Sequence, residues 1–163
     1  MEEKIELLEE WYKRIRNAQR GHYKDAEGLK RNKKLLGLPT VILSTLVGTS
    51  VFASLADSSS TGGMYIHPII IGMLSLLAAI FASLQTFLNY SEKSEKHLNA
   101  ARKLSSLKKE IQQNLITLER TPENLNEFII YIRKKWDEII NEAPLISRNN
   151  FSKFFENKKK PKK

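Results

Sequence analysis

Two long runs of apolar residues, 35–56 and 65–90, dominate the hydropathy pattern of the chain. Neither run contains a charged residue when His67 is counted as neutral. Roughly 20 helical residues cross the hydrocarbon core of a bilayer, and each run meets that length. A helical pair in the core of a soluble protein would normally carry charges along one face. We therefore predict a transmembrane hairpin whose short loop, 57–64, is rich in the turn-forming residues serine, threonine and glycine.

Lysine and arginine are absent from the predicted loop and abundant on the other side of the hairpin. Residues 1–36 contain ten of them and residues 90–163 contain seventeen, which together account for all 27 in the chain. Positive residues are retained on the cytoplasmic side of a membrane. The asymmetry therefore predicts that both termini are cytoplasmic and that the loop lies outside.

The segment 1–34 has the pattern of an amphipathic cytoplasmic helix. Apolar and aromatic residues recur at spacings of three and four from Ile5 onward, and charges fill the other positions. Four basic residues within 30–34 precede the first span. We interpret them as a topology anchor, with recognition of anionic lipid as the alternative. Pro39, at the opening of the span, is a position where the helix can kink.

Two more amphipathic helices are predicted after the second span. The first continues directly from the membrane and reaches about Arg120. The stretch Thr121-Pro122-Glu123 then has the capping residue, the first-turn proline and the acidic residue that begin a helix. Pro144 ends this last helix.

The predicted fold class is that of an all-α membrane protein, a two-helix transmembrane hairpin with a small cytoplasmic helical bundle. The bundle combines the segment 1–34 with the helices in 91–145, because each has one apolar seam that must pack on a neighbour. The basic tail, 146–163, is expected to be disordered. We expect the bundle to regulate the membrane part through six large apolar residues. They are Trp11, Ile15, Leu107, Ile111, Phe128 and Trp136.

The sequence offers little catalytic chemistry. The absence of cysteine excludes disulfides, thiol catalysis and cysteine-based zinc sites. The three histidines, His22, His67 and His97, lie in different segments without a second ligand at metal-binding spacing, and we interpret them as packing or surface residues. No phosphate-binding loop or nucleophile motif is present. We therefore expect no enzyme, no cofactor and no metal site.

The formal net charge of +9 raises the question of nucleic-acid binding. Phosphate binding needs basic residues gathered on one surface. Across residues 91–163 the basic residues are instead interleaved with ten acidic ones, which is typical of a solvated helical face. We therefore expect no direct nucleic-acid binding. The terminal lysine cluster is interpreted as a solubilising tail, with contact to RNA or anionic lipid as the alternative.

Small and polar residues form one stripe along the second span, at spacings of three and four. The stripe consists of Gly72, Ser75, Ala79, Ala82, Thr86 and Asn89, and similar residues in the first span are Ser44 and Gly48. Such a stripe favours close helix packing, within the hairpin or between copies, and the alternative is a pore wall. One hairpin cannot enclose water, so a pore would require several chains.

Several stretches also match a known family in their order and spacing. They are Trp11-Tyr12-Lys13-Arg14-Ile15-Arg16-Asn17-Ala18-Gln19, His22-Tyr23, Asn32, Leu36-Gly37-Leu38-Pro39-Thr40-Val41-Ile42-Leu43-Ser44-Thr45, Val47-Gly48-Thr49-Ser50-Val51-Phe52-Ala53, Leu84-Gln85-Thr86-Phe87-Leu88-Asn89-Tyr90-Ser91-Glu92-Lys93 and Glu95-Lys96-His97. With these residues the chain, over about residues 8–145, resembles the SLATT family of two-transmembrane proteins linked to bacterial anti-phage systems.

The resemblance implies an effector in the bacterial inner membrane. On infection it would assemble as a homo-oligomer, permeabilise the lipid bilayer and kill or arrest the host cell. In that family the trigger comes from a partner, such as a nucleotide second-messenger synthase, a nucleotide-binding sensor domain or a reverse transcriptase. No sensor domain is recognisable beyond the helical bundle, so the trigger is expected either to act in trans through a cytoplasmic partner or to bind the bundle itself. The alternative is a non-conducting membrane anchor that recruits a cytoplasmic defence partner.

Overall fold

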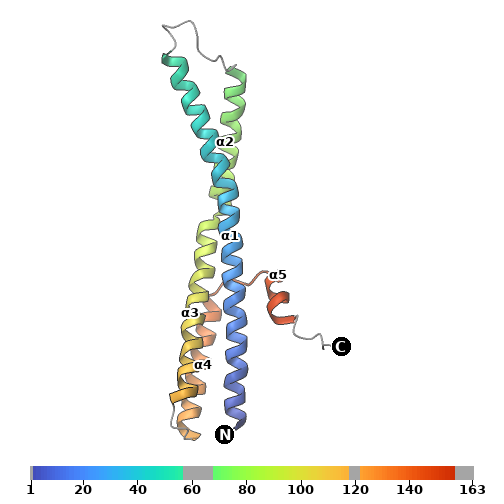
Figure 1. Cartoon of the computed structure of the whole chain (residues 1–163), viewed down its shortest axis with the longest axis vertical. Helices are drawn as coiled ribbons and strands as arrows, with labels where there is room; N and C mark the ends of the chain where they lie inside the picture. Colours follow the sequence, from blue (N-terminus) through green and yellow to red (C-terminus); the bar gives the residue numbers. More distant parts are fainter. Residues whose placement is uncertain (1, 57–67, 118–121, 157–163) are drawn as a thin grey trace. The chain divides into compact units, whose positions relative to one another are not determined.

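A computed structural model of the chain describes residues 2–56, 68–117 and 122–156 (Figure 1). This part of the chain is almost entirely helical and contains no strand. Two of its helical stretches are long and apolar enough to cross a membrane. The predicted all-α class is therefore confirmed. The elements are α1 (Glu2–Ala56), α2 (Pro68–Leu88), α3 (Tyr90–Thr117), α4 (Pro122–Glu142), α5 (Arg148–Phe151) and a π-helical turn (Ser152–Glu156).

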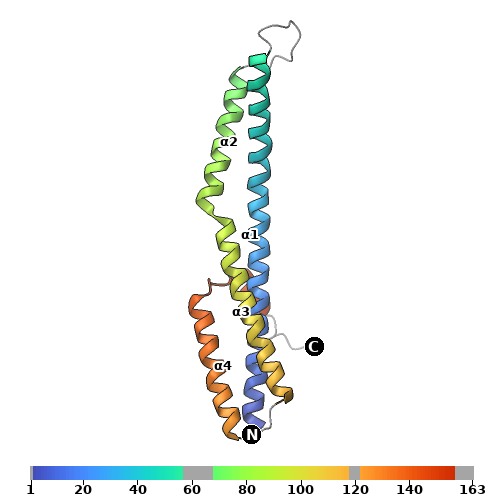
Figure 2. The same cartoon turned by 90° about the vertical axis from the view of Figure 1, so that its left-hand side faces the viewer.

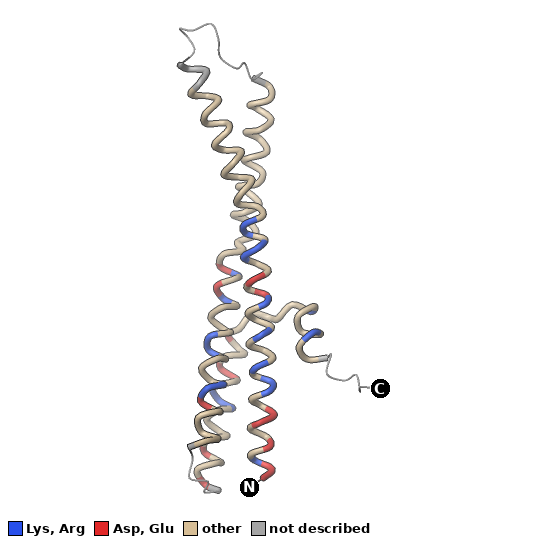
Figure 3. Tube along the Cα trace, viewed as in Figure 1, with Lys and Arg blue, Asp and Glu red and all other residues tan. Residues whose placement is uncertain are grey.

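The chain divides into two units, which we describe separately. The apolar hairpin comprises residues 29–91, with the second half of α1 and all of α2. The polar unit comprises residues 1–28 and 92–163, with the first half of α1, α3, α4 and α5. Figure 3 shows that charged residues are concentrated in the polar unit and at the adjoining end of the hairpin. The described part of the hairpin beyond Lys34 contains no charged residue before Ser91.

Helix α1 is continuous and joins the predicted cytoplasmic helix to the first predicted span. It passes through Pro39 without ending. Proline lacks the amide hydrogen that an interior helical position normally donates. In the next position, the hydroxyl of Thr40 donates a hydrogen bond of 2.8 Å to the carbonyl oxygen of Leu36. The predicted boundary near residue 34 is thus a change of surface chemistry and not a break in the backbone.

A single residue separates α2 from α3. Asn89 has a φ of 43°, the left-handed conformation that asparagine adopts more readily than most residues and that commonly ends a helix. The predicted helical continuation after the second span is therefore interrupted at this one residue, and the chain is helical again from Tyr90. A pattern of apolar spacing does not report a left-handed residue, because the spacing resumes on the far side. The predicted helix end near Arg120 lies outside the described residues.

The core of the polar unit lies between the first half of α1, α3 and α4, which run alongside one another in Figures 1 and 2. Burial of each large apolar side chain stabilises the unit by roughly 1.5–3 kcal/mol relative to its exposure. Because each helix has one apolar seam, three helices bury their seams together. The buried core residues are Leu8, Ile15, Leu104, Leu107, Ile111, Leu125 and Ile132.

The beginning of the tail has regular structure where the sequence predicted disorder. Residues 148–156 form α5 and the π-helical turn. The preceding residues are attached to α1 through Asp25 and Gly21, as described below. This contact between distant segments supplies hydrogen bonds that the composition of the tail does not reveal. The segment 157–163 lies outside the described residues.

Candidate functional site

The apolar hairpin packs through one face of α2. Residues of intermediate burial recur on that helix at spacings of three and four, while the intervening ones are exposed. The half-buried positions are Ile71, Leu74, Ser75, Ala78, Phe81, Gln85 and Leu88. Gln85 faces α1 at Gly37, where an added Cβ would lie 3.7 Å from the amide of Gln85. At the end of the hairpin, Lys33 Nζ donates to Ser91 Oγ over 3.1 Å.

The predicted small-residue stripe lies mostly on a different face of α2. Ala79, Ala82 and Thr86 are exposed, and an added Cβ at Gly72 would find nothing within 4 Å. The same open space surrounds Gly48 on α1. The exceptions are Ser75, which is half-buried, and Asn89, which occupies the break between α2 and α3. The sequence left open whether the stripe packs within the hairpin or between copies. The two helices of the hairpin pack through a different face of α2, so these residues do not form the contact within the hairpin.

The hydroxyl groups of the spans bond within their own helices. Ser75 Oγ donates to Ile71 O over 2.9 Å, and Thr86 Oγ1 donates to Ala82 O over 3.0 Å. On α1, Thr49 Oγ1 donates to Thr45 O over 2.9 Å. These bonds satisfy each donor without a second helix, which permits the hydroxyls to enter a bilayer. Each oxygen still has acceptor capacity for water or another chain.

All six residues predicted to form the regulatory bundle meet in the polar unit. Ile15, Leu107 and Ile111 are buried in its core, and Trp11, Phe128 and Trp136 pack against them. The rings of Trp11 and Trp136 make an edge-to-face contact with 5.8 Å between centroids and an interplanar angle of 65°. The buried Nε1 of Trp136 has no hydrogen-bond partner among the described residues. This indole therefore contributes packing and not a polar bond.

Two histidines that the sequence placed in unrelated segments form a buried pair. His22 on α1 and His97 on α3 are 4% and 8% exposed, and their Nδ1 atoms lie 3.0 Å apart. One Nδ1 must donate and the other accept, which requires at least one neutral ring. Burial, followed by the nearby His97, lowers the pKa of His22 to about 4, and Asp25 opposes this shift. Burial also lowers the pKa of His97, again opposed by Asp25.

Asp25 attaches the C-terminal segment to α1. Its carboxylate accepts hydrogen bonds from the backbone N and the hydroxyl of Ser147, at 2.7 and 2.5 Å, and from Nδ2 of Asn150 at 2.8 Å. Burial by itself would raise the pKa of Asp25, but the bonds from Ser147 and Asn150 outweigh it, so the pKa is lowered. One turn earlier, Gly21 leaves room for Ile146, whose side chain would lie 3.0 Å from an added Cβ. We call these contacts the C-terminal clamp.

Sequence reasoning missed the histidine pair and the clamp. The spacing of His22 and Asp25, three residues apart on one predicted helix, places them on one face and was the available indication. Their partners are 75 and 122 or more positions away. Another buried bond between α1 and α3 lies beside them, from Ser94 Oγ to Ala26 O at 3.0 Å.

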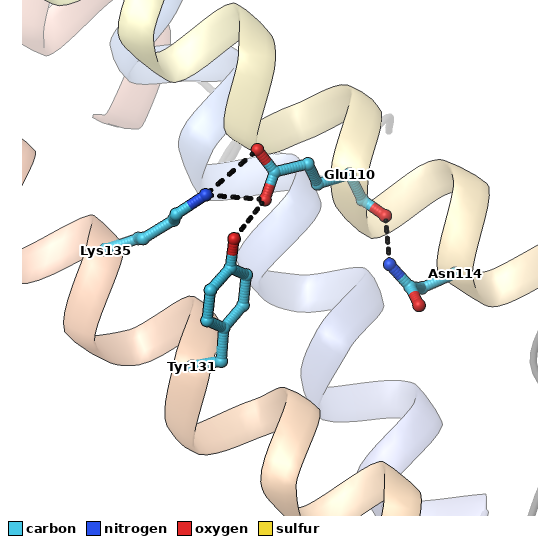
Figure 4. A network of polar contacts seen from close by, with 4 residues as sticks. All are labelled: Glu110, Asn114, Tyr131 and Lys135. Carbon is cyan, nitrogen blue, oxygen red and sulfur yellow. Dashed lines mark hydrogen bonds and ion pairs between the residues drawn. The ribbon is translucent and has the colours of Figure 1, made fainter.

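Polar contacts on the surface of the polar unit join α3 to α4 (Figure 4). Lys135 Nζ lies 3.2 and 3.3 Å from the two carboxylate oxygens of Glu110, and the Tyr131 hydroxyl donates to Glu110 over 3.2 Å. The same Lys135 Nζ lies 4.5 Å from the centroid of the Tyr131 ring. Its hydrogen bond with Tyr131, followed by Glu110, raises the pKa of Lys135 against the opposing effect of burial. Because such exposed pairs contribute at most about 1 kcal/mol, they favour one register and add little stability.

In the part of the chain that the structure describes, no group of three histidine, cysteine, aspartate or glutamate side chains comes together that could hold a metal ion. What remains is a pair of membrane-length apolar helices, an uncovered small-residue stripe and a packed helical unit. These features define the class of a two-pass membrane protein with an attached helical bundle.

The chain belongs to the SMODS and SLOG-associating 2TM effector domain family 4, whose sequence profile matches residues 5–153. The resemblance seen in the sequence is thereby confirmed. The family description assigns a membrane effector domain that associates with SMODS and SLOG proteins of conflict systems. Neither a curated protein nor a solved structure matches the chain.

Proposed function

We propose that this membrane effector oligomerises through its small-residue stripe and permeabilises the bacterial inner membrane when a partner triggers it. The observation that carries the proposal is the exposure of Ala79, Ala82 and Thr86 in the single chain. Small residues permit close approach of helices in a membrane, yet the hairpin leaves these three uncovered. A second copy can pack there, or water can line them once several copies assemble.

Assembly is needed because two helices cannot surround a water-filled path. The exposed hydroxyl of Thr86 keeps acceptor capacity, and polar groups at membrane depth face protein or water in preference to lipid. In a ring of hairpins, the stripe would therefore lie either at the contacts between copies or along the pore. Both placements require the same small side chains.

The polar unit is proposed to hold the effector silent until it receives the trigger. With both termini cytoplasmic, as the charge asymmetry predicts, the unit meets cytoplasmic partners directly. The partner classes that the family suggests are a nucleotide second-messenger system or a reverse transcriptase. Permeabilisation would then arrest or kill the infected cell. This role needs no catalytic residue in the chain.

The test is expression of matched variants without the partner, with membrane potential and crosslinked oligomer size as readouts. At high expression, mass action should assemble enough untriggered wild-type chains to depolarise cells. Ala79→Leu and Ala82→Leu should insert, because leucine favours insertion, but they should neither assemble nor depolarise. The control Ile80→Leu lies off the stripe and conserves volume, so it should behave as wild type. If both alanine variants depolarise cells fully, the stripe is neither seam nor pore, and a non-conducting adaptor becomes the better interpretation.

A further inference from the structure

We propose that the C-terminal clamp is exchanged between copies, so that in the assembled protein the segment 144–155 of one copy binds α1 of another. The proposal rests on the assembly step of the proposed function and names a second contact through which the copies are joined. The face of α1 that receives the segment contains Asn17, Gly21 and Asp25, which recur every four residues and are all buried. We call these three residues the clamp face.

The clamp face is separate from the helix face that forms the core of the polar unit. At 3.6 residues per turn, Gly21 lies roughly 120–140° around α1 from Leu8 and Ile15, which are buried in the core. In the part of the chain that the structure describes, the core residues and the side chains packed against them include none from 144–155. The segment can therefore leave its face while the core between α1, α3 and α4 stays closed.

The connector between α4 and α5 is suited to act as a hinge. Residues 143–147 join the two helices without helical structure of their own. Among the described residues, no backbone amide of 145–147 donates to another backbone group, and the side chain of Leu145 is 94% exposed. Beyond the connector, Phe151 stacks on Phe155 within the segment, with 4.7 Å between the ring centroids. The segment can thus move as one unit about a connector that few contacts hold.

A second copy carries every group that the clamp face binds. Within one chain, the Asp25 carboxylate accepts hydrogen bonds from Ser147 and Asn150, and Gly21 leaves room for Ile146. The same pairs can form between two chains, because exchange of an identical element between protomers needs no new contact. A different protein would need a peptide with isoleucine, serine and asparagine at the same spacing. The clamp face therefore favours a second copy as its partner.

Effective concentration decides between the closed and the exchanged arrangement. The short connector supplies the segment to its own α1 at an effective concentration on the order of millimolar, so an isolated chain should close on itself. Copies that are assembled side by side in the membrane supply neighbouring segments at a comparable concentration. We therefore expect closed clamps in the isolated chain and exchanged clamps in the assembly.

The experiment uses the full chain with Gly21→Cys and Ile146→Cys in every copy, because the chain contains no other cysteine. An added Cβ at Gly21 lies 3.0 Å from the Ile146 side chain, so mild oxidation should link the two positions whether the clamp is closed or exchanged. Chains with a short and with a long tag are reconstituted together into vesicles at low and at high protein density. Non-reducing electrophoresis then separates internally linked monomers from dimers that carry both tags.

Internally linked monomers should dominate at low density, and dimers with both tags should increase severalfold at high density. In the control, Arg20→Cys replaces Gly21→Cys beside Ile146→Cys. Because Arg20 is exposed next to the clamp face, the control should give few dimers at either density. Deletion of Leu145 shortens the connector by about 3.5 Å and removes only an exposed side chain, so it should increase the share of dimers further.

A separate amine-reactive crosslinker reports oligomers in the same vesicles. If oligomers form while every disulfide between positions 21 and 146 stays within one chain, or if dimers are no more frequent than in the control, exchange is wrong and the proposed function is unaffected. If neither oligomers nor dimers form, exchange and assembly are both wrong. Exchanged dimers of a protein that does not depolarise cells would support exchange and contradict permeabilisation.

Discussion

The imidazoles of His22 and His97 meet inside the polar unit with their Nδ1 atoms 3.0 Å apart, although 75 positions separate them in the sequence. Two protonated rings would direct two donors and two positive charges at each other. Burial and this mutual effect keep the pKa of His22 at about 4. The packed polar unit therefore accommodates the pair with at least one ring neutral.

Acidification should destabilise the polar unit. Both histidines have a folded-state pKa below the ordinary 6.5, so the unfolded chain binds protons first. The contribution of the two histidines to the free energy of unfolding is complete above pH 6.5, and it is lost as the pH falls toward about 4, where His22 titrates. The slope should be about 1 kcal/mol per pH unit for His22, and His97, whose pKa is also lowered, should add to it in the same direction. Chemical unfolding in detergent, followed by tryptophan fluorescence between pH 7.5 and 4.5 (roughly the titration range of a lowered histidine), measures it.

The control for the pH experiment is the double variant His22→Phe/His97→Phe, which removes both titrating rings and keeps aromatic volume. Its stability should change much less over the same range. If the free energy of unfolding of wild type stays constant from neutral pH to below the ordinary histidine pKa, the pairing of the two histidines is contradicted.

Truncation of Trp136 should loosen the polar unit. Trp136→Ala removes a large ring from the edge of the core and its contact with Trp11. Because the ring is only partly buried, we expect a loss of up to about 3 kcal/mol in the free energy of unfolding, the low end of the range for buried aromatic residues. Trp136→Phe should cost far less, because the indole Nε1 has no hydrogen-bond partner among the described residues. Thermal unfolding by circular dichroism distinguishes the two. If regulation depends on the bundle, only the alanine variant should release toxicity or abolish the response to the trigger.

Loss of the C-terminal clamp should expose the segment after Pro144. Asp25→Asn replaces charge-assisted hydrogen bonds to Ser147 and Asn150 with weaker or missing ones, at a cost of about 2 kcal/mol. Tryptic cleavage after Arg148 should then accelerate by about thirtyfold, the factor that this free energy gives in the population of the open segment. Because the pKa of Asp25 is lowered, its contribution is complete above the ordinary 3.8 and is lost only as the pH falls below that value. The clamp should therefore persist while the histidines titrate.

Two further variants test the geometry of the clamp. Gly21→Val places side-chain atoms against Ile146, which already lies 3.0 Å from an added Cβ, and it should also speed cleavage. Arg20→Gln, an exposed change on the same helix, should leave the rate unchanged. Equal cleavage rates for Asp25→Asn and Arg20→Gln would show that the contact does not hold the segment in solution.

The predicted topology can be tested with single cysteines in the cysteine-free chain. A cysteine at Ser59, in the predicted external loop, should react with a membrane-impermeant thiol reagent added to intact spheroplasts. Cysteines at Ser106 and Ser152 should react only after lysis, because the positive-inside rule places them in the cytoplasm. The reverse pattern would invert the orientation and remove the basis for a cytoplasmic trigger.

The sequence was a sufficient guide to the hairpin and to the apolar core of the bundle. Uncharged length alone identifies a membrane span. The spacing of Ile15, Leu107 and Ile111 identifies the helix faces that must be covered, and these residues are indeed buried. The same reasoning failed at Asn89, where a single left-handed residue interrupts a periodic pattern. It also failed for the tail, where Ser147, the residue before α5, donates two hydrogen bonds to Asp25.

The sequence by itself therefore determined that two helices suit a bilayer, which faces of the polar helices are apolar, and which family the chain belongs to. These are properties of composition and local period, and they do not depend on how helices dock. Only the tertiary structure decided that His22 meets His97, that Asp25 holds Ser147, and that the hairpin leaves Ala79 and Ala82 uncovered. Each of those relationships depends on the rotation and register of packed helices. Apolar periodicity shows which face of a helix is buried, but it does not show which residue of another helix each side chain contacts.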